Sequence, residues 1–181
     1  MKSKINYFAS LFTCLLLVFS LSAYSQSDKK GGGGGGNYLG PGNLNVGLST
    51  YWSYNSSLGF QADYEFNLGR DFTVGPSLSY AGYSDSWYNY SVFGVGARFR
   101  WYADRVLNIS HPKWDVFANG DIGFSIWSHR YTGPGSDPNS HSSTSPLWIG
   151  LGIGGKFHFN QKIGLQLIIG SGAQLGLHFQ L

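Results

Sequence analysis

The chain has few charged residues, one cysteine and, after its first 25 residues, no stretch of helical periodicity. Asp, Glu, Lys and Arg make up 12% of its 181 residues, about half the share in soluble domains, which is too little for a water-facing surface. The single cysteine, Cys14, lies in the N-terminal segment. The remaining chain therefore has no disulfide, thiolate metal site or cysteine nucleophile. The missing helical period excludes a helical bundle.

The first 25 residues have the features of a secretory signal peptide. Lys2 and Lys4 precede an apolar stretch at 8–21, and Ala23-Tyr24-Ser25 forms a small-x-small cleavage site. The apolar stretch is short for a membrane span, although a retained anchor is the alternative. We therefore expect residues 1–25 to be removed and the mature chain to begin near Gln26.

Residues 26–42 are expected to form a flexible linker that precedes a single domain at 43–181. The linker contains six consecutive glycines, Gly31–Gly36, and glycine-rich sequence behaves as flexible coil. Because Lys2 and Lys4 belong to the signal segment, the rest of the chain is nearly neutral, with 9 acidic residues in the whole sequence. No basic patch indicates nucleic acid as a partner.

From residue 43 to the last residue, apolar and polar residues alternate. Leu58, Phe60 and Leu68 share one parity, and Asp63 and Glu65 share the other. Successive side chains of a strand point to opposite faces, so this alternation predicts strands with one apolar face. The breaks between segments contain Gly, Ser, Asn and Pro, which favour turns. The pattern predicts eight strands, at 43–52, 58–68, 72–81, 90–102, 114–127, 147–159, 163–170 and 174–181.

The apolar face could point to lipid or into the core of a soluble secreted barrel or sandwich. The polar face of 147–159 carries little charge, because it consists mainly of glycine with Trp148, Lys156 and His158. Aromatic residues gather toward strand ends, as in membrane barrels. Trp52, Tyr80, Tyr90, Trp127 and Trp148 would lie at one rim, and Phe66, Phe72, Trp101, Tyr102, Trp114 and Phe159 at the other. We therefore expect the apolar face to meet lipid and the sheet to close, since lipid cannot satisfy backbone polar groups.

The alternating C-terminal strand and the length of the chain resemble the small eight-stranded outer-membrane barrels of the OmpX and OmpA-transmembrane-domain type. The resemblance implies a closed, all-β, antiparallel up-and-down transmembrane barrel in the bacterial outer membrane, with outer-membrane lipid, lipopolysaccharide and the barrel-assembly machinery as partners. The family's terminal insertion signal usually ends in an aromatic residue. Here Phe179 stands two residues before the terminal Leu181.

Seven charged residues fall on the inward, polar parity of the predicted strands: Asp63, Glu65, Arg98, Arg100, Asp115, Asp121 and Lys156. An eight-stranded barrel is just wide enough for side chains to fill it, so these charges would meet across the lumen. They would form either a salt-bridged plug, which we favour, or a charged constriction in a narrow ion or small-solute channel.

Histidines offer weaker candidates for chemistry. His129 and His141, with Asp137 between them, lie in a predicted loop at 128–145, where solvated side chains are the simpler interpretation. His158 and His178 lie on strands separated by another strand, so we expect no compact metal site and no cofactor. A lipid-modifying enzyme would need a base beside a nucleophile. His141, Ser142 and Ser143 are close in sequence, but no orienting acid can be identified, and we expect no catalysis.

The predicted loops at 53–57, 82–89, 128–145 and 170–173 would face outward. They contain an aromatic and cationic group of residues that could anchor in lipopolysaccharide or bind a surface protein: Tyr83, Trp87, Tyr88, His129, Arg130 and Tyr131. The sequence thus predicts a structural or surface-interaction role, with a channel and a lipid-modifying enzyme as the second and third alternatives.

Overall fold

The chain forms one closed barrel of eight antiparallel strands in a computed structural model that describes residues 42–51, 57–69, 71–84, 86–134 and 142–181. Each strand pairs with its neighbours in sequence, and β1 pairs with β8 to close the barrel. Among the described residues, no helix is long and apolar enough to cross a membrane. The strands are β1 Asn43–Tyr51, β2 Ser57–Gly69, β3 Phe72–Ser84, β4 Tyr88–Tyr102, β5 Trp114–Tyr131, β6 Ser142–His158, β7 Ile163–Gly170 and β8 Gly172–Gln180.

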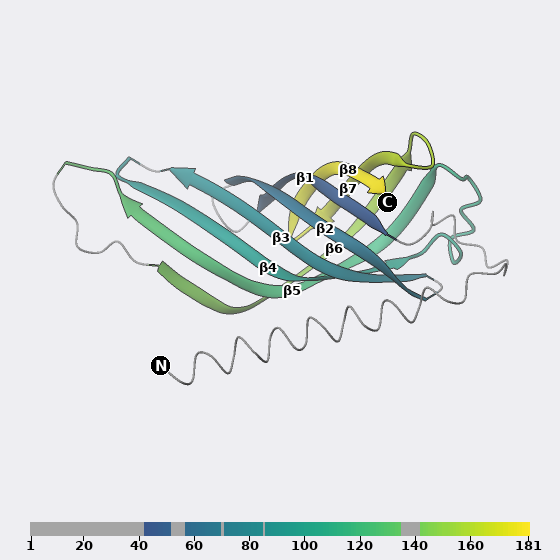
Figure 1. Cartoon of the computed structure of the whole chain (residues 1–181), viewed down its shortest axis with the longest axis horizontal. Coiled ribbons are helices and arrows are strands. Elements are labelled where there is room, and N and C mark those ends of the chain that lie inside the picture. The colour runs from purple at the N-terminus through teal and green to yellow at the C-terminus, as the bar shows by residue number, and fades with distance from the viewer. Residues whose placement is uncertain (1–41, 52–56, 70, 85, 135–141) are drawn as a thin grey trace.

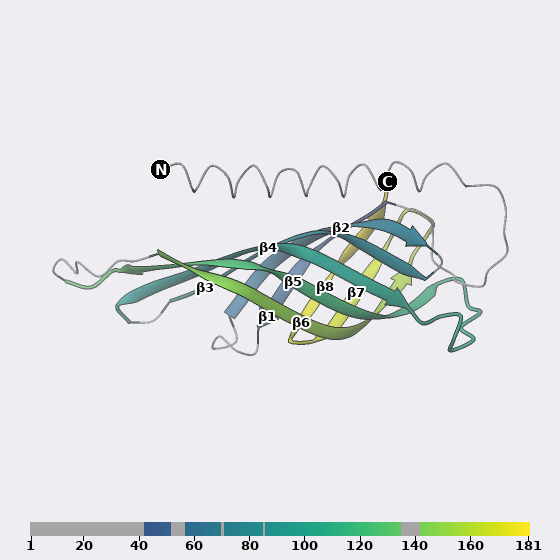
Figure 2. The same ribbon diagram turned by 90° about the horizontal axis from the view of Figure 1, so that it is seen from below.

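The predicted fold class is confirmed, but the middle strands are longer than the sequence indicated. β3, β4, β5 and β6 continue beyond the other four strands as a tilted sheet, at the left of the views in Figure 1 and Figure 2. The loop predicted at 82–89 is shorter in the structure, because β3 reaches Ser84 and β4 starts at Tyr88. The predicted loop at 128–145 is also too long, since β5 extends to Tyr131 and β6 begins at Ser142.

Polar residues fill the inside of the barrel and apolar residues cover its outside. Only five hydrophobic residues are buried among those described, whereas twenty polar or charged residues are. In contrast, Ile149, Leu151 and Ile153 are 67%, 69% and 70% exposed. A water-soluble barrel would have the reverse distribution, because exposed apolar patches of this extent are unfavourable in water. The outer face is therefore the lipid-facing surface of a transmembrane barrel.

Two predicted rim aromatics lie inside the barrel. Tyr102 is 1% exposed and follows Arg98 and Arg100 on the inward face of β4. Trp148 lies against Gly123 and Gly150, where an added Cβ would come within 3.0 Å of the indole. The parity of the strands decides these positions, since both rings share the inward face with polar residues. Trp52, the predicted signal segment 1–25 and all of the predicted linker except Gly42 lie outside the described residues.

The two ends of the barrel differ. The end that holds Asn43 and Gln180, here called the terminal end, also carries the long β4–β5 turn at 103–113. The opposite end, here called the far end, carries the β7–β8 hairpin and the extended sheet of β3–β6 (Figure 1).

Candidate functional site

The lumen holds a continuous network of buried ion pairs. Alternate residues of each strand point inward, and the strand register brings charged residues of adjacent strands side by side. Arg98 on β4 is the register partner of Asp121 on β5, and Asn45 on β1 is the partner of Asp63 on β2. Six of the seven charged residues predicted from the sequence join this network: Asp63, Glu65, Arg98, Arg100, Asp121 and Lys156.

Glu65 occupies the centre of the network. Its Oε1 accepts hydrogen bonds from Lys156 Nζ and from Asn45 Nδ2, and Arg100 Nη1 lies 3.0 Å away. Its Oε2 accepts the Tyr102 hydroxyl at 2.7 Å and the Thr73 hydroxyl at 3.0 Å. Lys156 also donates to the Tyr102 oxygen at 2.8 Å. Side chains from four other strands therefore converge on one carboxylate of β2 that is 1% exposed.

Asp63 links the centre to the far end of the lumen. Arg100 holds its carboxylate with two hydrogen bonds of 2.8 and 3.1 Å, and Arg98 Nη1 donates to it at 2.7 Å. Arg98 also holds Asp121, through Nε at 2.6 Å and Nη2 at 3.3 Å. Bidentate guanidinium–carboxylate pairs of this kind are short and directional.

The charges in this network balance. Three carboxylates, Asp63, Glu65 and Asp121, face the three cations Arg98, Arg100 and Lys156, and all six are at most 7% exposed. Neutral partners missed by the sequence reasoning add further hydrogen bonds, namely Gln61, Gln166, Tyr102, Thr73 and Asn45. Their inward parity, shared with the charges, is the signal that could have identified them. Burying these charges is tolerable only because each has an oppositely charged partner.

Asp115, the seventh predicted residue, lies apart from the network. Its register partner is Lys156, but Lys156 turns to Glu65, and Asp115 Oδ2 instead lies 2.7 Å from His158 Nε2. The His158 ring contacts His178 at a centroid distance of 4.7 Å and an interplanar angle of 81°. The two rings therefore meet although β7 lies between their strands.

Gly164 explains the contact between the two histidines. It lies on β7 between them and is the register partner of both His158 and His178. Because Gly164 has no side chain, the rings meet above its backbone. The described residues contain no group of three or more metal-ligating side chains placed to hold an ion.

The predicted surface residues lie mostly on strands. Tyr83 stacks on Tyr90 across β3 and β4, with ring centroids 4.6 Å apart and planes 9° apart, and Tyr88 contacts Tyr131 at 5.2 Å. His129 and Arg130 belong to the extension of β5. Trp87, 52% exposed, lies between β3 and β4. Paired tyrosines stabilise adjacent strands, which is why this segment is a sheet and not a loop. His141 and Asp137 lie outside the described residues.

Comparison with known proteins identifies the fold. No protein-family model and no curated protein sequence matches the chain. The Neisserial surface protein A structure is similar over 77% of this chain and 96% of its own, with 10% identity and a TM-score of 0.54. The structure of the attachment invasion locus protein Ail of Yersinia pestis matches 77% of this chain and 99% of its own, with 13% identity and a TM-score of 0.49. The structure of the N-terminal barrel domain of Pseudomonas aeruginosa OprF matches 77% of this chain and 98% of its own, with 16% identity and a TM-score of 0.46. The chain thus has the fold of an eight-stranded outer-membrane barrel.

Proposed function

We propose that this protein is a sealed outer-membrane barrel that anchors the extended β3–β6 sheet and presents it to partners outside the cell. The observation that carries the proposal is the charge-balanced network around Glu65, which draws side chains from seven of the eight strands into the lumen. Such a network fills the narrow lumen of an eight-stranded barrel. We assign the protein a non-catalytic role.

The alternative function is a narrow channel through the same lumen, and electrical recording separates the two. We expect purified protein in planar lipid bilayers to carry no steady current, because the Arg98 and Arg100 ion pairs block the path. Arg98→Ala removes the link between Asp63 and Asp121 and should introduce current, whereas Arg105→Ala, in the turn at the terminal end, should not. Steady wild-type current that Arg98→Ala leaves unchanged would support the channel instead.

The orientation belongs to the proposal as well. A signal peptide at 1–25 and a linker at 26–42 would leave the terminal end in the periplasm, after insertion by the barrel-assembly machinery. The far end would then be extracellular. On the outward side of the extended sheet, Tyr80, Ser84, Asn89, Ser128 and Arg130 line a shallow depression, at a level suited to lipopolysaccharide head groups.

Site-specific labelling tests the location and orientation together. The only cysteine, Cys14, lies in the proposed signal peptide. Labelling of the mature protein would therefore come from the single introduced cysteine and would show on which side of the membrane it lies. Trp87→Cys should react with a membrane-impermeant maleimide on intact cells. Leu107→Cys, at a similarly exposed position in the β4–β5 turn, should react only after the outer membrane is permeabilised. The opposite pattern would invert the orientation, and no labelling of Trp87→Cys on intact cells would contradict surface display.

A further inference from the structure

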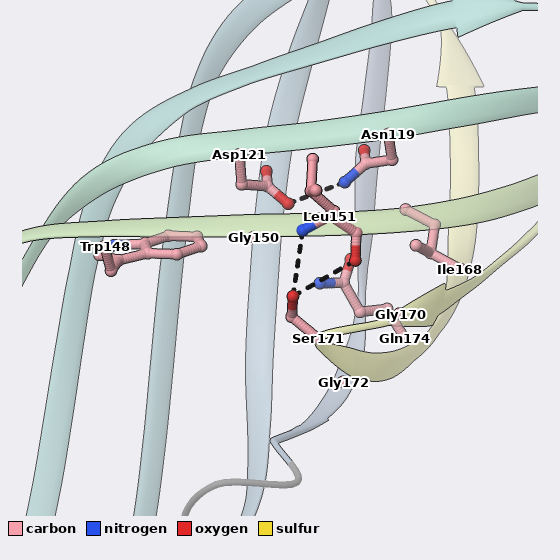
Figure 3. Close-up of a pocket in the computed structure, with 10 residues that line it drawn as sticks. All are labelled: Asn119, Asp121, Trp148, Gly150, Leu151, Ile168, Gly170, Ser171, Gly172 and Gln174. Atoms are coloured by element: carbon pink, nitrogen blue, oxygen red, sulfur yellow. Dashed lines mark hydrogen bonds between the residues drawn. The ribbon is translucent and has the colours of Figure 1, made fainter.

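A small cavity lies at the far end of the lumen, where Asp121 ends the ion-pair network. It has a volume of about 20 Å³, which is room for one group of the size of a water molecule. Figure 3 shows Trp148 on one side of this cavity, Ile168 on the other, and Asp121 hydrogen-bonded to Asn119. The lining residues are Asn119, Asp121, Trp148, Gly150, Leu151, Ile168, Gly170, Ser171, Gly172 and Gln174.

The polar lining of this cavity offers hydrogen-bond acceptors. Asn119 Nδ2 donates to Asp121 Oδ2 at 2.8 Å. A carboxylate only accepts, so this bond fixes the amide orientation of Asn119 and leaves its Oδ1 as the second acceptor. Asn119 Oδ1 and Gln174 Oε1 are both buried and have no hydrogen-bond partner among the described residues. A buried polar atom without a partner costs free energy, so these oxygens favour a ligand that donates.

Trp148 adds an aromatic surface to the same cavity. Its indole lies against Gly123 and Gly150, which have no side chain to lift it from the wall. The faces of aromatic rings attract cations. Two unpaired amide oxygens and an indole therefore favour a small cation with several N–H donors over an anion or a neutral acceptor.

We propose that this cavity binds the ammonium group of a small primary amine. A protonated primary amine carries three donors on one nitrogen, and its ammonium group alone is about the size of a water molecule. Asp121 is already paired with Arg98, so the site gains no net negative charge from it, and we expect weak, selective binding in the millimolar range. This inference does not depend on the proposed anchoring role, because a sealed lumen and a channel would both contain the cavity.

Titration with methylammonium and tetramethylammonium, followed by nuclear magnetic resonance of the detergent-solubilised protein, tests the proposal. Methylammonium should shift the indole N–H resonance of Trp148, assigned with Trp148→Phe, in a saturable manner. Tetramethylammonium has no N–H donor and is too large, so it should shift nothing. No shift with methylammonium means that the cavity holds water only, and equal shifts with both ions mean non-specific attraction. Either result overturns the proposal.

Substitutions on β8 provide matched variants for this titration. Gln174→Glu adds a carboxylate to the lining and should tighten methylammonium binding about tenfold, whereas Gln180→Glu, at the terminal end of the same strand, should leave the affinity unchanged. Gln174→Leu removes an unpaired oxygen, which should not destabilise the barrel, and should abolish the shift. Equal effects of the two Glu variants would also overturn the proposal. A lysine derivative blocked at both backbone ends carries the same ammonium, and its binding would distinguish a protein side chain from a free amine as the ligand.

Discussion

Individual charged residues contribute to stability here through their partners and not through contact with water. Glu65 and Lys156 are each 1% exposed, and each depends on the other and on Tyr102 for its hydrogen bonds. Removing one member of such a group leaves the others charged and buried. The free energy lost on substitution therefore exceeds the net contribution of the ion pair itself.

Lys156→Met should destabilise the folded barrel by about 3–5 kcal/mol, because it leaves Glu65 with one buried cation fewer. Lys162→Met is the matched control, since Lys162 is exposed at the β6–β7 turn, and should change stability by less than about 0.5 kcal/mol. Urea unfolding in lipid vesicles, followed by the shift in gel mobility between folded and unfolded protein, measures both. Equal midpoints would mean that the network around Glu65 adds no stability.

The carboxyl group of Asp104, at the terminal end, should make the stability of the barrel depend on pH. Burial, followed by the nearby carboxylate of Asp115, raises the pKa of Asp104 from 3.8 to about 6. The folded protein therefore holds this proton more tightly than the unfolded chain, and stability falls as the pH rises from about 4 to about 6. Asp104→Asn removes this loss and should be more stable than the wild type by ~1–2 kcal/mol at pH 7, with no difference below pH 4.

A second carboxylate in the same region serves as the control for this pH effect. Asp71 accepts hydrogen bonds from Arg105, so Asp71→Asn loses an ion pair and should be less stable than the wild type at pH 7. Urea midpoints measured from pH 4 to pH 8 compare the two variants. A parallel pH profile for Asp104→Asn and the wild type would contradict the assignment to Asp104.

At the level of single residues, alternation predicts the face of a side chain but not its partner. Asp63, Glu65 and Arg98 could be placed in the lumen by parity alone. Lys156 could not be assigned to Glu65 over its register neighbour Asp115, because the choice depends on the reach of a long side chain across the barrel. Tyr102 has inward parity, yet its aromatic ring and its place at a strand end favoured a lipid-facing rim.

At the level of strands, one glycine brings two distant side chains together. A Cβ at Gly164 would overlap His178 Nε2 and the carbonyl oxygen of Phe157. Gly164→Ala should therefore cost about 1–3 kcal/mol, as overpacking does, and should separate the His158 and His178 rings. Gly120→Ala, where the nearest atom to the new Cβ is Leu151 Cδ2 at 3.9 Å, should cost less than about 0.5 kcal/mol. Urea midpoints of the two variants, with histidine resonances as a local probe, decide the question, and equal midpoints would exclude a packing role for Gly164.

The lengths of the strands could be predicted only in part. Turn residues mark the ends of β7 and β8 clearly, and these strands fall within two residues of the prediction. The extensions of β3–β6 were missed because serine, asparagine and glycine are as common in loops as in strands that leave the membrane. Once a strand passes the apolar band, neither face is selected for burial, and alternation ends although pairing continues.

The whole molecule is a polar network enclosed by an apolar surface, and the membrane is the solvent that makes this arrangement stable. Backbone groups are satisfied by closure of β1 on β8, and the charged groups of the network pair with opposite charges inside the lumen. Stability of the whole barrel therefore depends on where an added charge lies along the barrel axis.

Two exposed leucines test this dependence. Leu151, on β6, is 69% exposed on the apolar band, and Leu107, in the β4–β5 turn, is 57% exposed. Leu151→Arg should destabilise the barrel in lipid vesicles by about 2–4 kcal/mol, because the guanidinium would lie in hydrocarbon. Leu107→Arg should change stability by less than about 0.5 kcal/mol, since the turn lies beyond the strands and in water. Urea midpoints in vesicles measure both variants. If Leu151→Arg were tolerated as well as Leu107→Arg, the assignment of the apolar face to lipid would be wrong.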